Sequence, residues 1–297
     1  MGLALPALRL IAREHQKKPL KGPILTIGRQ CVYATVSDIQ KMLHEEGLKP
    51  HILPKGCNIA TNIPAWKNTP LKKYTSDRVF FMLLTGHPSF ALDISRYEDA
   101  EYAWDLNHKI PSYLEHVFGT VIDSGSLEHV FNVSEALINM NRLTAPDGKI
   151  IHLTPANNYL EHGFYQFSPT LFTDYYGVNN FANISCKLIE QPLLDGNRNW
   201  TTWKWNFKRP YTNIITNRMN VIFVSAQKQE SSTEDVIPQQ GEYSHHGEGG
   251  RTGEFQLSSW QKTIIESSPI WLISFIKRIL CKDLKIKPWG LKYTGKV

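Results

Sequence analysis

Residues 119–143 read GTVIDSGSLEHVFNVSEALINMNRL, and this stretch decides the fold of the 297-residue chain. Its first part, Gly119–Asp123, is a short apolar run that predicts a buried β-strand ending in an acidic residue. Its last part, Val133–Leu143, carries apolar residues at helical spacing and predicts a helix. A buried strand followed by a turn and a helix is the repeating unit of α/β proteins, in which helices cover a mostly parallel sheet.

The same unit recurs on both sides of this stretch. Strands are predicted over 23–28, 90–94, 101–104 and 149–154, and helices over 36–46, 77–84 and 169–176. Two more strands, 184–191 and 220–227, follow each other without a helical pattern, which favours an antiparallel pair at the edge. The predicted fold class is therefore α/β, with a doubly wound, mostly parallel sheet, an antiparallel edge strand pair and a C-terminal helical tail.

Composition divides the chain into a body and a tail. We assign residues 1–228 to one domain with a Pro-rich insertion at about 50–75, residues 229–257 to a flexible polar linker, and residues 258–297 to a basic amphipathic segment. Residues 262–297 hold eight Lys and Arg against Glu266 and Asp283, so the net charge of +6 lies entirely in the tail. A neutral body gives no sign of a nucleic-acid groove.

Several features point to a cytoplasmic protein without a membrane span. The four cysteines form no C-x-x-C pair and fit no zinc module or disulfide framework, which predicts reduced thiols. No apolar run reaches about 18 residues. The basic tail has two readings: a helix docked on the body, or an interfacial helix giving weak peripheral membrane contact through residues 264–292.

Small and acidic residues follow four of the predicted strands. They are Gly28 after the first, Asp93 after the second, Asp105 and Leu106 after the third, and Asp123, Ser124 and Gly125 after the fourth. In a doubly wound sheet, ligands bind beyond the carboxyl ends of the strands. Carboxylates there can accept hydrogen bonds from ribose hydroxyls and from an adenine amine, so the pattern predicts an adenosine-binding crevice. Each residue alone could equally be a helix cap or a turn residue.

The segment Val121–Asn132 resembles the motif after strand four in class I S-adenosylmethionine-dependent methyltransferases. Pro146–Ile150 resembles the turn into their fifth strand, and Val221–Lys228 resembles their last strand. The segment His162–Pro169 is similar to a segment of poorly characterised bacterial methyltransferase-like proteins, which also carry Gly-Arg-Gln early in the chain. The resemblance implies a Rossmann-like sheet, S-adenosylmethionine as cofactor, and methyl transfer to a small molecule, with a sugar as one suggested acceptor. It places Arg29 near the methionine carboxylate.

The first loop departs from the family pattern. The usual G-x-G-x-G is replaced by Gly28, Arg29, Gln30 and Cys31, and Asp93 follows Gly28 by 65 residues where nucleotide folds use about 20. This degenerate loop favours a second hypothesis, a catalytically inactive binding or scaffold protein of the same fold. A nicotinamide or nucleotide-sugar enzyme is a third, disfavoured because G-x-G-x-x-G is missing.

Three histidines are candidates to take a proton if the methyl acceptor is a hydroxyl. His129 and His162 are the predicted catalytic residues, because imidazole titrates near neutral pH and His162 follows the fifth strand, where substrates approach. His152 lies within a strand and is expected to be structural. We predict no metal site: the pair His245–His246 has no acid or cysteine ligand at metal spacing.

Overall fold

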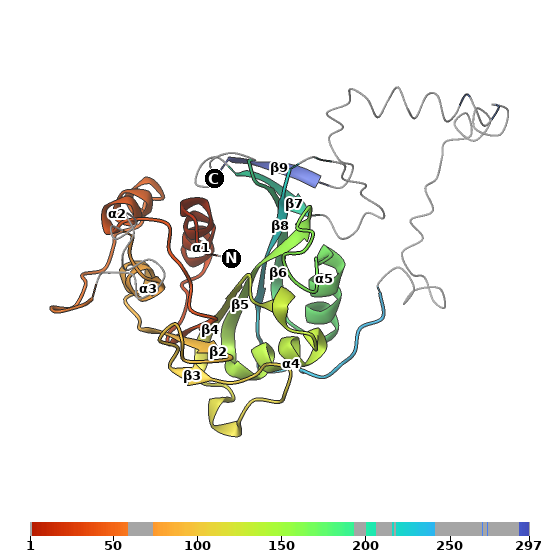
Figure 1. Ribbon diagram of the computed structural model, residues 1–297, viewed down its shortest axis with the longest axis horizontal. Helices are drawn as coiled ribbons and strands as arrows, with labels where there is room; N and C mark the ends of the chain where they lie inside the picture. Colours follow the sequence, from red (N-terminus) through yellow and green to blue (C-terminus); the bar gives the residue numbers. More distant parts are fainter. Residues whose placement is uncertain are drawn as a thin grey trace.

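The computed structural model describes residues 2–58, 74–192, 200–205, 216, 218–240, 269, 272 and 291–296. In these residues one mixed sheet has the strand order β3-β2-β1-β4-β5-β8-β6-β7-β9 (Figure 1). In this order the strands span Tyr102–Ala103, Ser89–Asp93, Ile24–Ile27, Phe118–Ser124, Thr144–Asn157, Asn220–Gln227, Ala182–Glu190, Thr201–Trp205 and Leu291–Lys296.

The sheet is parallel from β3 to β5 and antiparallel beyond. Strand β8 runs against both β5 and β6, so it is a reversed strand inserted between two parallel ones. The doubly wound, mostly parallel, Rossmann-like class predicted from the sequence is confirmed, and the strands 184–191 and 220–227 do pair antiparallel. They do not form the edge, because β7 and β9 extend the sheet past β6.

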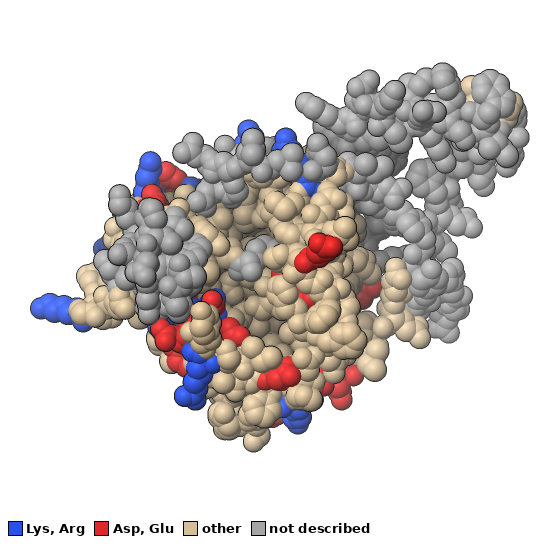
Figure 2. All heavy atoms as spheres, in the orientation of Figure 1, with Lys and Arg blue, Asp and Glu red and all other residues tan. Residues whose placement is uncertain are grey.

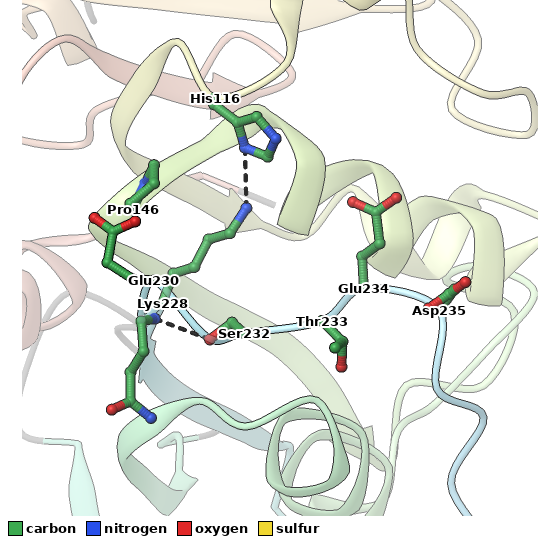
Figure 3. Close-up of a pocket in the computed structure, with 9 residues that line it drawn as sticks. His116, Pro146, Lys228, Glu230, Ser232, Thr233, Glu234 and Asp235 are labelled. Atoms are coloured by element: carbon green, nitrogen blue, oxygen red, sulfur yellow. Dashed lines mark hydrogen bonds between the residues drawn. The ribbon is translucent and has the colours of Figure 1, made fainter.

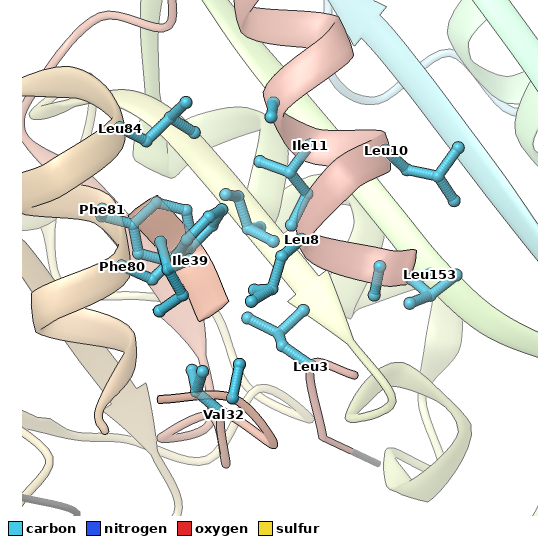
Figure 4. Close-up of a cluster of buried hydrophobic side chains, with 14 of the residues drawn as sticks. Leu3, Leu8, Leu10, Ile11, Val32, Ile39, Phe80, Phe81, Leu84 and Leu153 are labelled. Carbon is cyan, nitrogen blue, oxygen red and sulfur yellow. The ribbon is translucent and has the colours of Figure 1, made fainter. Parts of the chain in front are cut away.

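Helices cover both faces of the sheet (Figure 1). One face packs against α1 (Leu5–Lys17), α2 (Val36–Glu45) and α3 (Asp77–Thr85), and this layer of the core includes Leu8, Ile11, Ile39, Phe80 and Phe81 (Figure 4). The other face packs against α4 (Val133–Leu143) and α5 (Pro169–Val178). Successive residues of a strand point to opposite faces, so the apolar strands β1, β4 and β8 contribute to both layers.

Local chemistry explains where the helices begin. Thr35 forms a capping box with Asp38 at the start of α2, and the Ser76 hydroxyl accepts from Val79 N at the start of α3. Asn132 and Ser168 cap α4 and α5 in the same way. These four helices agree with the sequence predictions to within two residues. Helix α1 was not predicted, although Pro6 in its first turn is a typical start signal.

The segment expected to be a linker is partly tied to the body. Asn141 Nδ2 donates to Thr233 O at 2.7 Å, Arg142 pairs with Glu234 at 2.7 Å, and Asn179 Nδ2 donates to Val236 O at 2.9 Å. Residues 229–236 therefore lie against α4, α5 and the turn after α5. Most of the predicted insertion, the pair His245–His246 and most of the predicted amphipathic tail lie outside the described residues. Residues 291–296 of that tail form strand β9 and not part of a helix, which corrects the prediction of a helical tail there. Within the described part of the chain, no helix has the length and apolar character needed to span a bilayer.

Candidate functional site at the carboxyl edge of the sheet

The topological switch point of the sheet lies between β1 and β4. From β1 the chain order continues outward through β2, and from β4 it continues in the opposite direction through β5. Ile27 is paired with Leu92 on one side and with Asp123 on the other. The residues that follow these strands are therefore brought to one edge, where open α/β sheets bind ligands.

Gly28 stands at this switch point in a left-handed conformation. Its φ is +72°, and its N–H donates to Leu92 O at 2.7 Å. A β-carbon at this position would lie 2.9 Å from Ser126 Oγ and 3.6 Å from Asp93 Oδ2. The Ser126 hydroxyl in turn donates to Ile27 O at 2.7 Å. The structure thus brings the turn after β1, the acid after β2 and the turn after β4 together.

Arg29 turns away from this edge and into the protein. Its side chain is 2% exposed and pairs with Asp77 at 3.1 Å and with Glu101 at 2.6 Å. Burial alone would raise the pKa of Glu101, but a hydrogen bond from Ala91 N–H and the Arg78 guanidinium together lower it. This corrects the prediction that Arg29 faces a methionine carboxylate, because its charge is neutralised by two internal carboxylates.

Asp77 holds the loop after β1 from a distant part of the chain, and sequence reasoning did not identify it. It is fully buried at the start of α3, and its carboxylate accepts from Gln30 N at 3.1 Å and from the Arg29 guanidinium. The side chain of Gln30 folds back, donating to Ile27 O at 2.9 Å and to Gly28 O at 3.3 Å. The pair Ser76-Asp77 signals a helix start, but nothing in the local sequence links it to a loop 48 residues earlier.

Asp93 and Asp105 remain at the surface of this edge. Asp93 is half-buried, and its Oδ1 accepts from Ile94 N at 2.7 Å. Trp104 N donates to Asp93 O at 2.8 Å, which sets the third strand beside the second. Asp105 Oδ1 accepts from Asn107 N and Nδ2, and the backbone hydrogen bond lowers the pKa of Asp105. Leu106 is buried in the core beneath this loop.

Asp123 is committed to the protein interior. It is fully buried, and its Oδ1 accepts from Ser126 N at 3.0 Å and Leu127 N at 3.1 Å. Its Oδ2 lies 3.1 Å from His152 Nδ1, and His152 Nε2 lies 2.6 Å from Tyr176 Oη. Asp123 therefore shapes the turn after β4 rather than offering oxygens to a ligand, which corrects its predicted direct role. His152 is structural, as expected.

Ser124 and Gly125 form the wall of the edge next to Asp123. Both are buried, and Gly125 has a φ of +81°. The Ser124 hydroxyl oxygen is buried without a hydrogen-bond partner in the described structure. A buried hydroxyl without a partner costs free energy, so a ligand that supplies one is favoured here.

Glu128, His129 and His162 form a second cluster beside the turn after β4. Glu128 Oε1 lies 3.4 Å from His162 Nε2 and 3.9 Å from His129 Nε2. Glu128 is fully buried, whereas His162 and His129 are 34% and 49% exposed. Burial, reinforced by the Asp123 charge, raises the pKa of Glu128 to about 8, and burial lowers the pKa of both imidazoles. The two histidines singled out in the sequence thus share one site.

A close backbone contact holds this cluster together. Phe164 N donates to Glu128 O at 2.8 Å, so the segment after β5 crosses directly over Glu128. Gly163 permits the crossing, because a β-carbon there would lie 2.8 Å from Glu128 O. Apolar side chains stand open to solvent on the same two segments: Phe164 and Phe131 pack edge to face at 5.7 Å, and Leu160 is 85% exposed.

Acidic side chains accompany the predicted nucleoside side of the edge. The segment 93–105 carries five of them: Asp93, Glu98, Asp99, Glu101 and Asp105. Figure 2 shows acidic side chains gathered over β2 and β3. Glu101 is used by Arg29 and Arg78. Among the other four acids, Asp93 ends strand β2 and Asp105 follows strand β3, and these two are the acceptors expected for ribose and adenine.

A hollow lies at the opposite end of the strands. It has a volume of about 410 Å³ and is lined by residues that include His116, Lys228 and Glu234 (Figure 3). Lys228 comes directly after Gln227, which pairs with Lys149 in the first half of β5. The hollow therefore lies at the amino ends of the parallel strands. Lys228 Nζ donates to Asn141 O and Thr144 O, and burial lowers the pKa of Lys228 to about 8. These bonds to the main chain give Lys228 a structural role.

No family model matches the sequence, and no curated protein matches it. Solved structures are similar to the chain, among them methyltransferases and methyltransferase domains. A SAM-dependent methyltransferase from Archaeoglobus fulgidus is 11% identical over 74% of this chain and 94% of that chain, with a TM-score of 0.37. The 1,6-didemethyltoxoflavin-N1-methyltransferase of Burkholderia thailandensis is 11% identical over 76% and 80%, with a TM-score of 0.37.

Phosphoethanolamine N-methyltransferase 2 of Haemonchus contortus is 10% identical over 76% of this chain and 54% of that chain, with a TM-score of 0.42. The match to the structure of the citrinin polyketide synthase CMeT domain covers 52% of that chain, so this protein spans about half its length. Similarities at this level concern the arrangement of strands and helices, and each activity belongs to the protein that bears the name.

Proposed function

We propose that this chain binds S-adenosylmethionine at the switch-point edge and transfers its methyl group to a small-molecule nucleophile. The observation that carries the proposal is the meeting of Gly28, Asp93 and Ser126. A side chain at residue 28 would collide with Ser126, so the glycine lets the turns after β1 and β4 meet closely at the edge where the ligand is expected. The resemblance of Val121–Asn132 to the methyltransferase motif assigns the ligand class.

The chain's own groups suit the parts of such a ligand. Asp93 accepts hydrogen bonds from the two ribose hydroxyls, and Asp105 accepts from the adenine amine, with Leu106 as apolar support. Ser124 and Gly125 line the opposite wall, where the unpartnered Ser124 hydroxyl gains a partner. Arg29 and Asp123 support the site without contacting the ligand. Arg29 holds the loop after β1 through Asp77, and Asp123 holds the turn after β4. When bound, the cofactor supplies an electrophilic methyl group on a sulfonium.

The acceptor is expected next to the segment that follows β5. Methyl transfer is an in-line displacement, so holding the two reacting atoms close and aligned supplies much of the rate. Exposed Leu160 and Phe164 offer apolar surface for a small molecule there. For a hydroxyl acceptor such as a sugar, His129 and His162 remain the groups predicted to receive its proton. Cofactor binding does not depend on them.

The first test is binding of S-adenosylmethionine by calorimetry and thermal shift. The melting temperature of the wild type should rise with ligand, because binding to the folded state adds about 2.7 kcal/mol to the free energy of unfolding at a ligand concentration of 100 times Kd. Asp93→Ala should weaken binding at least about 10-fold, because it removes one charged hydrogen-bonding partner worth about 1.5–3 kcal/mol. Glu230→Ala is the matched control, since Glu230 is an exposed acid at the other end of the sheet. Equal binding by Asp93→Ala and wild type would remove the ribose assignment.

A catalytically inactive binding protein is the second candidate. It is favoured by Gln30, whose side chain fills the loop after β1 with hydrogen bonds to Ile27 O and Gly28 O. The two candidates differ in whether S-adenosylhomocysteine is formed. An active enzyme releases S-adenosylhomocysteine when incubated with a panel of sugars, phenols and amines, whereas the inactive form binds ligand and releases none. No binding at millimolar cofactor, with the fold intact, would reject the first proposal and favour a scaffold.

A further inference from the structure

Two imidazoles and one carboxylate meet at a single point beside the turn after β4. The ligand atoms of Glu128, His129 and His162 all lie within 4.8 Å of one another. Glu128 and His129 are adjacent in the chain, and His162 joins them through the hydrogen bond from Phe164 N to Glu128 O. From this geometry we propose that Glu128, His129 and His162 bind a divalent transition-metal ion of the zinc class.

The spacing suits a metal. Ligand atoms about 2.0–2.2 Å from a shared ion lie about 2.9–3.5 Å from each other. The separations from Glu128 Oε1 are 3.4 Å to His162 Nε2 and 3.9 Å to His129 Nε2. The separation to His129 Nε2 exceeds this range by about 0.4 Å, so ion binding requires the exposed His129 ring to shift. Two histidines and one carboxylate are also a donor set that iron and zinc use in proteins, and imidazole suits zinc, copper, iron and nickel.

The second observation is the lack of partners for buried polar atoms at this point. Both carboxylate oxygens of Glu128 and His162 Nε2 are buried without a hydrogen bond in the described structure. An isolated buried carboxylate carries a desolvation cost that an opposite charge offsets. A divalent ion held between Glu128 and the two rings supplies that charge and gives all three groups a partner.

The ligand positions also indicate what the ion would hold. Glu128 closes the buried side, while His129 and His162 are 49% and 34% exposed and open toward solvent. Three protein ligands leave at least one coordination position free. That position lies beside the segment that carries the exposed Leu160 and Phe164, so it suits an oxygen or nitrogen donor of a small molecule. A ring nitrogen that binds the ion cannot also accept a proton, so in the metal-bound protein His129 and His162 hold the ion in place of receiving the acceptor's proton. Metal binding does not rest on methyl transfer and is measured without cofactor.

The test uses the full-length, untagged protein after treatment with a chelator. It is titrated with Zn²⁺ alone by calorimetry and with Co²⁺ alone by visible absorption. We expect one ion per chain, cobalt bands of a site with imidazole ligands, and a higher melting temperature with Zn²⁺. His129→Ala, His162→Ala and Glu128→Gln should each weaken the affinity about 100-fold or more.

Two controls separate this site from others. His44→Ala removes an exposed histidine of α2 and should leave the affinity unchanged. The double variant His245→Ala/His246→Ala removes the other histidine pair of the sequence and should also bind normally. Glu128→Gln is nearly isosteric and removes a buried charge, so it should fold with a metal-free melting temperature at least equal to that of the wild type. If Glu128→Gln folds normally but no longer gains melting temperature with zinc, that result by itself supports the proposal. Binding that survives in all three site variants, that disappears in the 245/246 variant, or that is absent from the wild type overturns it.

Discussion

Gly28 shows how one residue can determine how the turns after β1 and β4 meet at the switch-point edge. Its φ of +72° is unfavourable for most residues with a β-carbon, and a β-carbon would come within 2.9 Å of Ser126 Oγ. We predict that Gly28→Ala lowers the free energy of unfolding by about 1–2 kcal/mol through the left-handed backbone. It should also weaken S-adenosylmethionine binding, because the new methyl group displaces Ser126 and with it the turn after β4. Urea unfolding and calorimetry measure the two effects.

Gly47 provides the matched control for this prediction. It has the same φ of +72° after helix α2, but no atom lies within 4 Å of the β-carbon position. Gly47→Ala should therefore cost about 1–2 kcal/mol of stability through the backbone alone. Its cofactor affinity should equal that of the wild type. If both variants lost binding equally, the effect would come from stability and not from the crevice.

The direction of a side chain was harder to predict than its position. The sequence placed Gly28, Asp93 and the residues after Asp123 at one edge, because strand ends converge in any parallel sheet. It did not predict that Arg29 turns inward, because its partner Asp77 lies 48 residues away in the chain. A buried guanidinium needs carboxylate partners, so Arg29, Asp77 and Glu101 form a unit that only the tertiary structure defines.

At the scale of elements, the segment between β5 and α5 determines the second cluster. It crosses the turn after β4 at Gly163, where a β-carbon would lie 2.8 Å from Glu128 O and 3.1 Å from Glu128 Cγ. We predict that Gly163→Ala displaces this segment, costs about 1–3 kcal/mol of stability as an overpacked site does, and weakens zinc binding by separating His162 from Glu128. Binding of S-adenosylmethionine should be retained, since Gly28 and Asp93 are untouched.

Gly177 is the control for this second substitution. It lies near the end of α5, and no atom lies within 4 Å of its β-carbon position. Gly177→Ala should raise the free energy of unfolding by up to about 1 kcal/mol, because alanine favours the helix, and should leave both affinities unchanged. Normal zinc affinity in Gly163→Ala would show that the crossing does not hold the cluster.

Most helices and strands could be predicted because their signals are local. Helices α2 to α5 have apolar residues at helical spacing and polar caps, and the buried strands are short apolar runs. Strands β7 and β9 were missed, because their pairing joins residues about 90 positions apart and β7 mixes Thr, Lys and Trp. The contact between the segment after β5 and Glu128 was missed for the same reason: the residues that meet are distant in the chain.

At the scale of the whole molecule, the two helical layers depend on their connections to the sheet. Asp147, in the turn that leads into the inner part of β5, pairs with Lys18 at 2.7 Å and Lys21 at 2.6 Å in the connection between α1 and β1. The hydrogen bonds from Lys18 and then Lys21 hold the pKa of Asp147 below its usual range. These pairs link the amino-terminal helix to the centre of the sheet, and α1 contributes Leu8 and Ile11 to the core.

The sign of the resulting pH dependence follows from the lowered pKa of Asp147. The unfolded chain binds a proton at about pH 3.9, and the folded chain binds it only at lower pH, so the contribution is present above that value and is lost as pH falls. We predict that the wild type loses stability more steeply than Asp147→Asn below about pH 5, while at pH 7 the wild type is the more stable protein. The difference should be small, because half-exposed pairs contribute about 0.2–1 kcal/mol each, and 1 M salt should reduce it. Urea unfolding from pH 3 to pH 7 measures it, with Glu230→Ala as a control that removes an unrelated acid. Parallel pH profiles for wild type and Asp147→Asn would mean that the connection between α1 and the sheet is held by apolar packing and not by these ion pairs.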